Sequence, residues 1–256
     1  MNFDQLLSAF GKKEFVPIYL LHGPEAYYID QLEAAIEAHA LQEHEKAFNH
    51  TIIYGKDADH LTIVDAARRF PMMAERQLVV LREAQDMRTL NQLAGYAEKP
   101  SPTTVLVICH KHKKLSGTTK LAKAIKKNGV SFEAKPLYDN QVPDWVQRYL
   151  KRRKYSIEPA ASELLGEYLG TSLSKIANEL DKLLLNVPTG TTITVKIVEE
   201  QVGISKDYNV FELNKALGMK DPVKANRIVN YFTANPKAGP LPVVLGSLYT
   251  YFSKLF

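Results

Sequence analysis

Short apolar runs alternate with amphipathic stretches through the first 138 residues, and no other feature of the chain constrains its fold as strongly. The run TVLVIC, residues 104–109, is apolar at every position, as a central parallel strand is when both faces of its sheet are covered. The runs that predict strands are Ile18–Leu21, Phe48–Ile53, Leu78–Leu81, Thr104–Cys109 and Val130–Glu133. The stretches that predict helices are Glu25–Leu41, Leu61–Arg68, Thr89–Tyr96 and Thr118–Lys127. Residues 1–138 are therefore predicted to form an α/β domain with a parallel sheet covered by helices.

After Pro136 the pattern becomes helical only. Helical spacing recurs in residues 141–155, 158–170 and 171–186, which predicts a small all-helical domain over residues 139–206. Residues 207–256 are predicted to be the first part of a third domain, also all-helical. The chain stops inside a strongly apolar helix that would leave Tyr249, Phe252, Leu255 and Phe256 poorly covered, so we expect it to be a fragment of a longer protein.

The composition, 45% apolar and 24% charged residues, is typical of a globular protein with packed cores. No apolar run approaches the length of a membrane span, and the amphipathic N-terminus does not indicate a secretory signal. The single cysteine, Cys109, excludes an internal disulfide and a cysteine-cluster zinc site, so we expect a buried thiol and a cytoplasmic protein. His110 and His112 lack a third ligand at a suitable spacing, so we predict no metal site and expect both histidines to be exposed to solvent.

The segment PIYLLHGPEAYYID, residues 17–30, begins as a phosphate-binding loop begins, with a strand, a glycine and a helical pattern. Counted from Gly23 along G-x-x-x-x-G-K-[ST], the second glycine is Tyr28, the lysine is Ile29 and the hydroxyl residue is Asp30. The three groups that would hold a nucleotide are all missing. We therefore predict no cofactor and no ATP hydrolysis by this chain.

Four segments occur together in order: PIYLLHGPEAYYID, FPMMAERQLVVLREA, SLSKIANELDKLLL and VFELNKALGMKDPVKANRIVN. With them the chain resembles the delta subunits of bacterial DNA polymerase III. The resemblance implies an AAA+ architecture, like that of the P-loop NTPases, without a functional phosphate loop. It also implies a non-catalytic subunit of the polymerase III holoenzyme, a DNA-directed DNA polymerase and hence a nucleotidyltransferase.

In DNA replication such a subunit binds the beta sliding clamp and opens its ring for loading onto primed DNA. The third domain would join the gamma/tau and delta prime subunits of the clamp loader.

In that family the clamp is held by an apolar pair at the tip of a helix, just before a strand. The pair falls here on Met72 and Met73, with Phe70 and Pro71 beside them. The family often has Leu-Phe at these positions, so Met-Met is a departure, although methionine is flexible and fills hydrophobic clefts well. The residues alone leave an alternative, since apolar side chains before a strand commonly pack beneath the sheet. A clamp-binding pair should instead be exposed.

Seven lysines and no acidic residue lie between Lys111 and Lys127. On the predicted helix Lys120, Lys123 and Lys127 share a face that could follow the phosphate backbone of DNA, or could simply be solvated. The net charge of +5 permits contact with nucleic acid without requiring it. Two other functions remain open from the residues, an active AAA+ ATPase and a stand-alone DNA-binding module.

Overall fold

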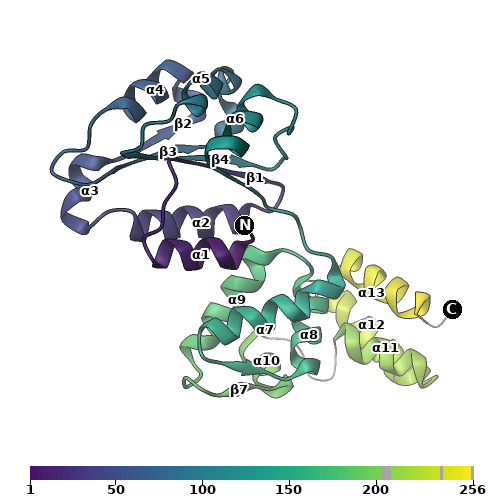
Figure 1. The fold of residues 1–256 in the computed structure, drawn as a ribbon. Helices are drawn as coiled ribbons and strands as arrows, with labels where there is room; N and C mark the ends of the chain where they lie inside the picture. Colours follow the sequence, from purple (N-terminus) through teal and green to yellow (C-terminus); the bar gives the residue numbers. More distant parts are fainter. Residues whose placement is uncertain (203–208, 237–238, 255–256) are drawn as a thin grey trace. The chain divides into compact units, whose positions relative to one another are not determined.

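The computed structural model describes residues 1–202, 209–236 and 239–254, and its Cα atoms form two compact units, Met1–Pro136 and Leu137–Phe256 (Figure 1). Each unit is described by itself. The first ends within two residues of the predicted end of the α/β domain. The predicted boundary between residues 206 and 207 lies outside the described residues, so the division into three domains stays a prediction.

The first unit contains a parallel five-stranded sheet in the order β2-β3-β4-β1-β5. Its strands are β1 Ile18–Gly23, β2 His50–Tyr54, β3 Gln77–Arg82, β4 Thr104–Lys111 and β5 Val130–Glu133. Helices α1 Phe3–Gly11 and α2 Ala26–His39 cover one face, and α4 His60–Arg68, α5 Ala94–Glu98 and α6 Lys120–Asn128 cover the other (Figure 1). Alternate residues of each strand pack into opposite layers, with Ile18 and Leu20 in one core and Tyr19 and Leu21 in the other. The predicted α/β fold class is confirmed.

Two local predictions in this unit were wrong. Phe48 and Asn49 are the last residues of an unpredicted helix, α3 Glu43–Asn49, so β2 begins at His50. A capping box starts α3, with the Glu45 carboxylate accepting the backbone N–H of Gln42 at 2.7 Å. The predicted helix Thr89–Tyr96 is split into a 3-10 turn, η3 Leu90–Leu93, followed by α5.

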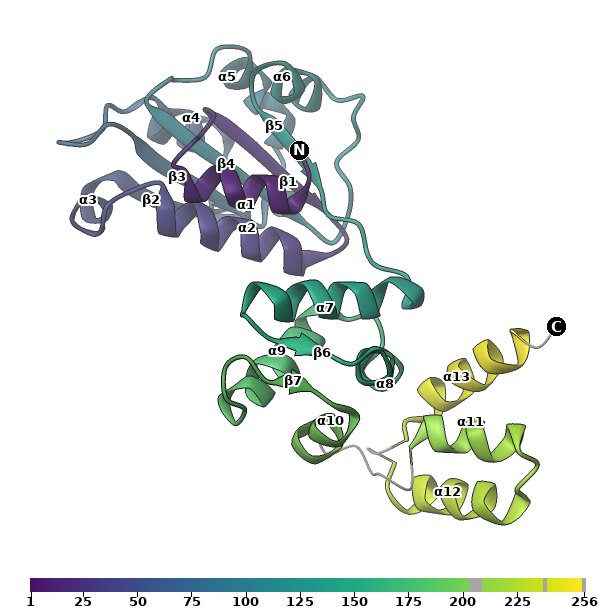
Figure 2. The same cartoon turned by 60° about the horizontal axis from the view of Figure 1, so that its bottom comes forward.

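The second unit is mainly helical, as the sequence predicts (Figure 2). Its helices are α7 Val142–Arg152, α8 Pro159–Leu169, α9 Leu173–Leu185, α10 Val195–Val202, α11 Val210–Gly218, α12 Pro222–Ala234 and α13 Leu241–Ser253. Two short strands, β6 Ser156–Ile157 and β7 Thr192–Ile193, also pair in parallel within the domain that was predicted to be all-helical. Tyr249 and Phe252 are exposed on α13, whereas Leu255 and Phe256 lie outside the described residues. None of the described helices is long and apolar enough to cross a membrane.

Candidate functional site

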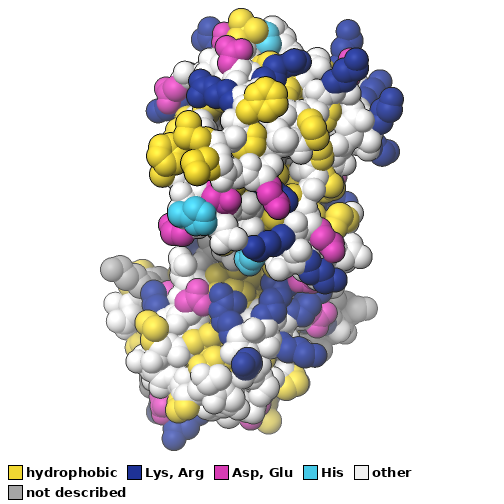
Figure 3. Space-filling view, turned by 60° about the vertical axis from the view of Figure 1, so that its left-hand side comes forward, with side chains coloured by type: hydrophobic (Ala, Val, Ile, Leu, Met, Phe, Trp, Pro, Cys, Tyr) yellow, Lys and Arg dark blue, Asp and Glu magenta, His cyan; other side chains and the backbone are white. Residues whose placement is uncertain are grey.

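The loop between α4 and β3 carries the predicted apolar residues Phe70, Pro71, Met72 and Met73, which we call the knob. Phe70 is 89% exposed, Met72 57% and Met73 97%, and Pro71 is half-buried. These three exposed side chains do not pack beneath the sheet. Hydrophobic side chains gather on the face of the first unit that Figure 3 presents, and the loop lies at the end of that unit occupied by α3 (Figure 1). The knob is thus an accessible apolar surface.

Two buried amide side chains tie the loop to the rest of the unit, and neither was predicted from the sequence. Gln77, at the start of β3, places Nε2 2.6 Å from the Arg69 carbonyl oxygen and 3.1 Å from that of Ala66. The same nitrogen lies 2.9 Å from Thr104 Oγ1, so the end of α4 is fixed to the sheet. Asn49, at the end of α3, bonds to the backbone of Met72. The knob therefore projects from an anchored loop.

The glycine turn at the end of β1 is closed by the chain's own backbone. Gly23 has φ +137°, and a Cβ atom added there would lie 2.2 Å from the carbonyl oxygen of Ala134. That oxygen accepts the backbone N–H of Glu25 at 3.2 Å. The Glu25 carboxylate in turn accepts the N–H of Tyr27 at 3.1 Å, and burial raises the pKa of this carboxyl. An acidic side chain thus caps α2 where a phosphate loop would present free N–H groups to an anion.

The three residues that replace the phosphate-binding groups are held within the first unit. The Tyr28 ring lies 4.8 Å from that of Phe3, and Ile29 is fully buried in the core between the sheet and α2. Asp30 Oδ1 is 2.8 Å from the ammonium nitrogen of Lys111, at the end of β4. The lysine position of a phosphate loop is therefore part of the hydrophobic core, and the hydroxyl position is part of an ion pair.

Lys111 also lies 3.1 Å from Glu83 Oε1, so its charge is shared between two carboxylates from different elements. Burial lowers the pKa of Lys111, but hydrogen bonds to Asp30 and Glu83 outweigh this and hold the pKa above its ordinary value. The ammonium group of Lys111 is consequently neutralised by the carboxylates of Asp30 and Glu83.

Arg82, the last residue of β3, also pairs within the unit. Its guanidinium contacts the buried Glu33 carboxylate and lies 3.0 Å from Glu37 Oε1. Cys109 Sγ donates to the other Glu33 oxygen at 3.3 Å, and burial together with this carboxylate raises the thiol pKa well above its usual value. The prediction of a buried thiol is confirmed, and the raised pKa disfavours a reactive thiolate.

The prediction that His110 is exposed to solvent was wrong, because its side chain is buried in β4 beside His22 of β1. His110 Nδ1 donates to the carbonyl of Lys113 at 3.0 Å, and burial lowers the pKa of the imidazole. His112 is exposed, as expected. Across residues 1–202, 209–236 and 239–254, no group of three or more His, Cys, Asp or Glu side chains could hold a metal ion.

Helix α6 exposes the lysines Lys120, Lys123 and Lys127 and buries Leu121 and Ile125 against the sheet. None of these three ammonium groups forms an ion pair in the described part of the chain. The structure therefore presents a basic helix face and leaves both of its interpretations open, a DNA contact and a solvated surface.

A sequence model of the family "DNA polymerase III, delta subunit" matches residues 19–135. The resemblance to this family is therefore confirmed. The DNA polymerase III subunit delta of Bacillus subtilis (strain 168) is 29% identical over 231 residues, covering 86% of this chain and 66% of that protein. The solved structure of the Bacillus subtilis DNA clamp loader delta protein YqeN has a TM-score of 0.69 and 24% identity, covering 91% of this chain and 71% of that one. The chain thus spans slightly less than two thirds of the length of the curated relative.

The delta-subunit match contains every residue predicted for a site, from Gly23 in the glycine turn to Lys127 on α6. It includes the knob and the loop that carries it. The second unit lies beyond the matched residues.

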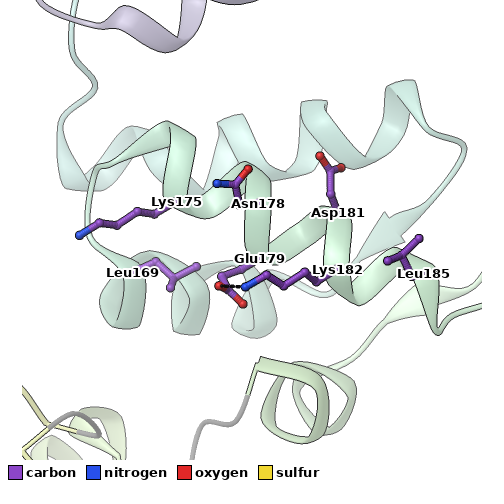
Figure 4. Close-up of a pocket in the computed structure, with 7 residues that line it drawn as sticks. All are labelled: Leu169, Lys175, Asn178, Glu179, Asp181, Lys182 and Leu185. Carbon is purple, nitrogen blue, oxygen red and sulfur yellow. Dashed lines mark hydrogen bonds and ion pairs between the residues drawn. The ribbon is translucent and has the colours of Figure 1, made fainter.

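A shallow cavity of about 470 Å³ in the second unit contains none of the predicted residues (Figure 4). It is lined by Leu169, Lys175, Asn178, Glu179, Asp181, Lys182 and Leu185. Glu179 pairs with Lys182 at 2.7 Å, and Asp181 lies 3.4 Å from the Arg153 guanidinium. Both carboxylates of the cavity therefore pair with basic side chains.

Proposed function

We propose that this chain acts as a clamp-loader delta subunit, which binds the beta sliding clamp through the knob and opens the ring for loading onto primed DNA. The observation that carries the proposal is the exposed knob, Phe70–Met73, inside a segment that matches the delta-subunit family. Membership in the polymerase III holoenzyme and a role in cytoplasmic DNA replication follow from the same resemblance. The partners in the loader would be the gamma/tau and delta prime subunits.

The knob has the physical properties that such a contact needs. Each exposed methionine that enters an apolar cleft of the clamp would contribute about 1.5–3 kcal/mol by removal of its surface from water. The loop is fixed at its base by Gln77 and in its middle by Asn49, so the binding energy would act on the sheet rather than be absorbed by a mobile segment. The anchored loop would thus allow the first unit to exert force on the clamp edge through Met72 and Met73.

We propose further that the chain does not hydrolyse ATP and that neighbouring subunits do. Three features of the first unit support this: Glu25 caps α2, Ile29 is buried in the core, and Asp30 pairs with Lys111. A triphosphate at the Gly23 turn would meet the Glu25 and Asp30 carboxylates, and Lys111 is already paired with Asp30 and Glu83. Titration with a fluorescent ATP analogue and magnesium tests this directly, and tight binding would favour the ATPase alternative.

The lysine face of α6, Lys120, Lys123 and Lys127, is proposed as a secondary contact to the DNA backbone within the assembled loader. Its support is the absence of ion pairs to these three side chains in the part of the chain that the structure describes. A stand-alone DNA-binding module would instead bind duplex with submicromolar affinity and steep salt dependence without any clamp.

The decisive experiment is a calorimetric titration of the cognate sliding clamp with the double variant Met72→Ala, Met73→Ala. Loss of two buried methionines should weaken binding by at least ~100-fold, and the free energy of unfolding should not change, because both side chains are exposed. Met219→Ala is the matched control, since Met219 is an exposed methionine of the second unit. Unchanged affinity of the double variant would refute the proposed contact.

A further inference from the structure

The side-chain amide of Asn49 pairs with the backbone of the knob at Met72. Asn49 Oδ1 accepts the Met72 N–H at 2.7 Å, and Asn49 Nδ2 donates to the Met72 carbonyl at 2.9 Å. The same nitrogen donates to the carbonyl of Glu45 at 3.0 Å, one turn earlier in α3. Asn49 is only 3% exposed, so these three hydrogen bonds are shielded from water.

This arrangement needs the chemistry of asparagine. A primary amide offers one acceptor and two donors, which is what the two backbone groups of Met72 and the carbonyl of Glu45 require. Ionised aspartate would lack both donors, and alanine would leave the Met72 groups without these partners. Because Asn49 is also bonded to its own helix, the knob is tied to α3, a regular element, rather than to another loop.

The residue that follows the tie has an unfavourable backbone conformation. Met73 has φ +52°, in the left-handed region that disfavours residues with a Cβ by about 1–2 kcal/mol. Such a conformation persists only where the surroundings impose it. The paired hydrogen bonds fix the backbone of Met72. The side chain of the next residue, Met73, is 97% exposed.

We propose that Asn49 is a positioning residue that holds the knob in its clamp-binding conformation before the clamp arrives, an inference that rests on the proposed function. A loop without this tie would sample many conformations, and ordering it on binding would reduce affinity. Asn49 itself need not touch the clamp. Its effect on binding passes entirely through Met72 and Met73.

The test compares Asn49→Ala with a matched control, Asn128→Ala, in the full chain. Asn128 also joins two segments through its amide, with hydrogen bonds of 2.8 and 3.1 Å to the carbonyls of Ala97 and Glu98, but it lies on α6. Asn49→Ala should remove the hydrogen-exchange protection of the Met72 amide and raise the Kd for the clamp about tenfold. Asn128→Ala should change neither quantity.

A double-mutant cycle separates positioning from a direct contact or general damage. In the background of Met72→Ala and Met73→Ala, adding Asn49→Ala should weaken the residual clamp binding no further. If Asn49→Ala fails to fold, Asn49→Asp keeps the side-chain volume and the acceptor and removes the donors, and it should also raise the Kd.

The outcomes distinguish this inference from the proposed function. Clamp affinity lost in the double methionine variant but retained after Asn49→Ala, with the Met72 amide unprotected, would overturn the positioning role alone. Affinity retained in the double methionine variant would overturn the proposed function itself.

Discussion

Replacing Met73 by glycine should move clamp affinity and stability in opposite directions. Met73 is 97% exposed and has φ +52°, so its side chain contributes little to the free protein while its backbone is strained. Relief of about 1–2 kcal/mol of left-handed strain, offset by roughly 0.5–1 kcal/mol of added chain entropy in the unfolded state, gives a net stabilisation of about 0–1.5 kcal/mol. The loss of one buried methionine at the clamp should weaken binding by about 10- to 150-fold.

Urea denaturation measures the first quantity, and calorimetric titration with the sliding clamp measures the second. Met73→Ala is the control, because alanine removes the side chain but keeps the strained backbone. Both variants should lose affinity, and glycine should be the more stable of the two. Glycine less stable than alanine, or either variant binding as tightly as the parent chain, would refute the reasoning.

Three further predictions concern the degenerate phosphate loop and the buried histidine beside it. Ile29→Lys restores the lysine of a phosphate loop at a fully buried position, so it should destabilise the protein by about 3 kcal/mol or more in urea and still give no tight binding of a fluorescent ATP analogue. Gly23→Ala should lower the free energy of unfolding by about 3 kcal/mol, since the new Cβ would lie 2.2 Å from the Ala134 carbonyl oxygen at φ +137°, and a variant of parental stability would contradict that close approach. Burial lowers the pKa of His22, so the unfolded chain takes up this proton at higher pH than the folded protein, and the His22 contribution to stability should fall as pH decreases from about 7 toward the folded pKa. His22→Asn, which keeps an acceptor for the N–H of Leu115, should flatten that decline between pH 7.5 and 5.5, and equal slopes would count against it.

The sheet was predictable because its central strands β1, β3 and β4 are apolar on both faces, and all five strands were identified in order. Helix α3 was missed because its seven residues, EHEKAFN, have little hydrophobic periodicity. Its last two residues, Phe48 and Asn49, were instead assigned to the next strand, although the Asn49 side chain bonds back to the Glu45 carbonyl of the same helix. His110 was misplaced for a similar reason, since its burial depends on β4 extending to Lys111.

The candidate site was also predictable only in part. Family resemblance located the knob at Met72 and Met73, but the residues alone could not decide whether it was buried, because exposure depends on the path of the loop after Arg69. Asn49 had no signal in the sequence, since its partner lies 23 residues away and is a backbone group that any residue type could supply.

The burial of Ile29 limits how a nucleotide site could be engineered at the Gly23 turn. Building a nucleotide site there would require a lysine at Ile29, a glycine at Tyr28 and a hydroxyl at Asp30, and the last change would remove one of the two carboxylate partners of Lys111. The first of these changes alone would damage the interior before any ligand could compensate for it. Substitutions on the exposed surface of the first unit are therefore far less constrained than substitutions at this turn.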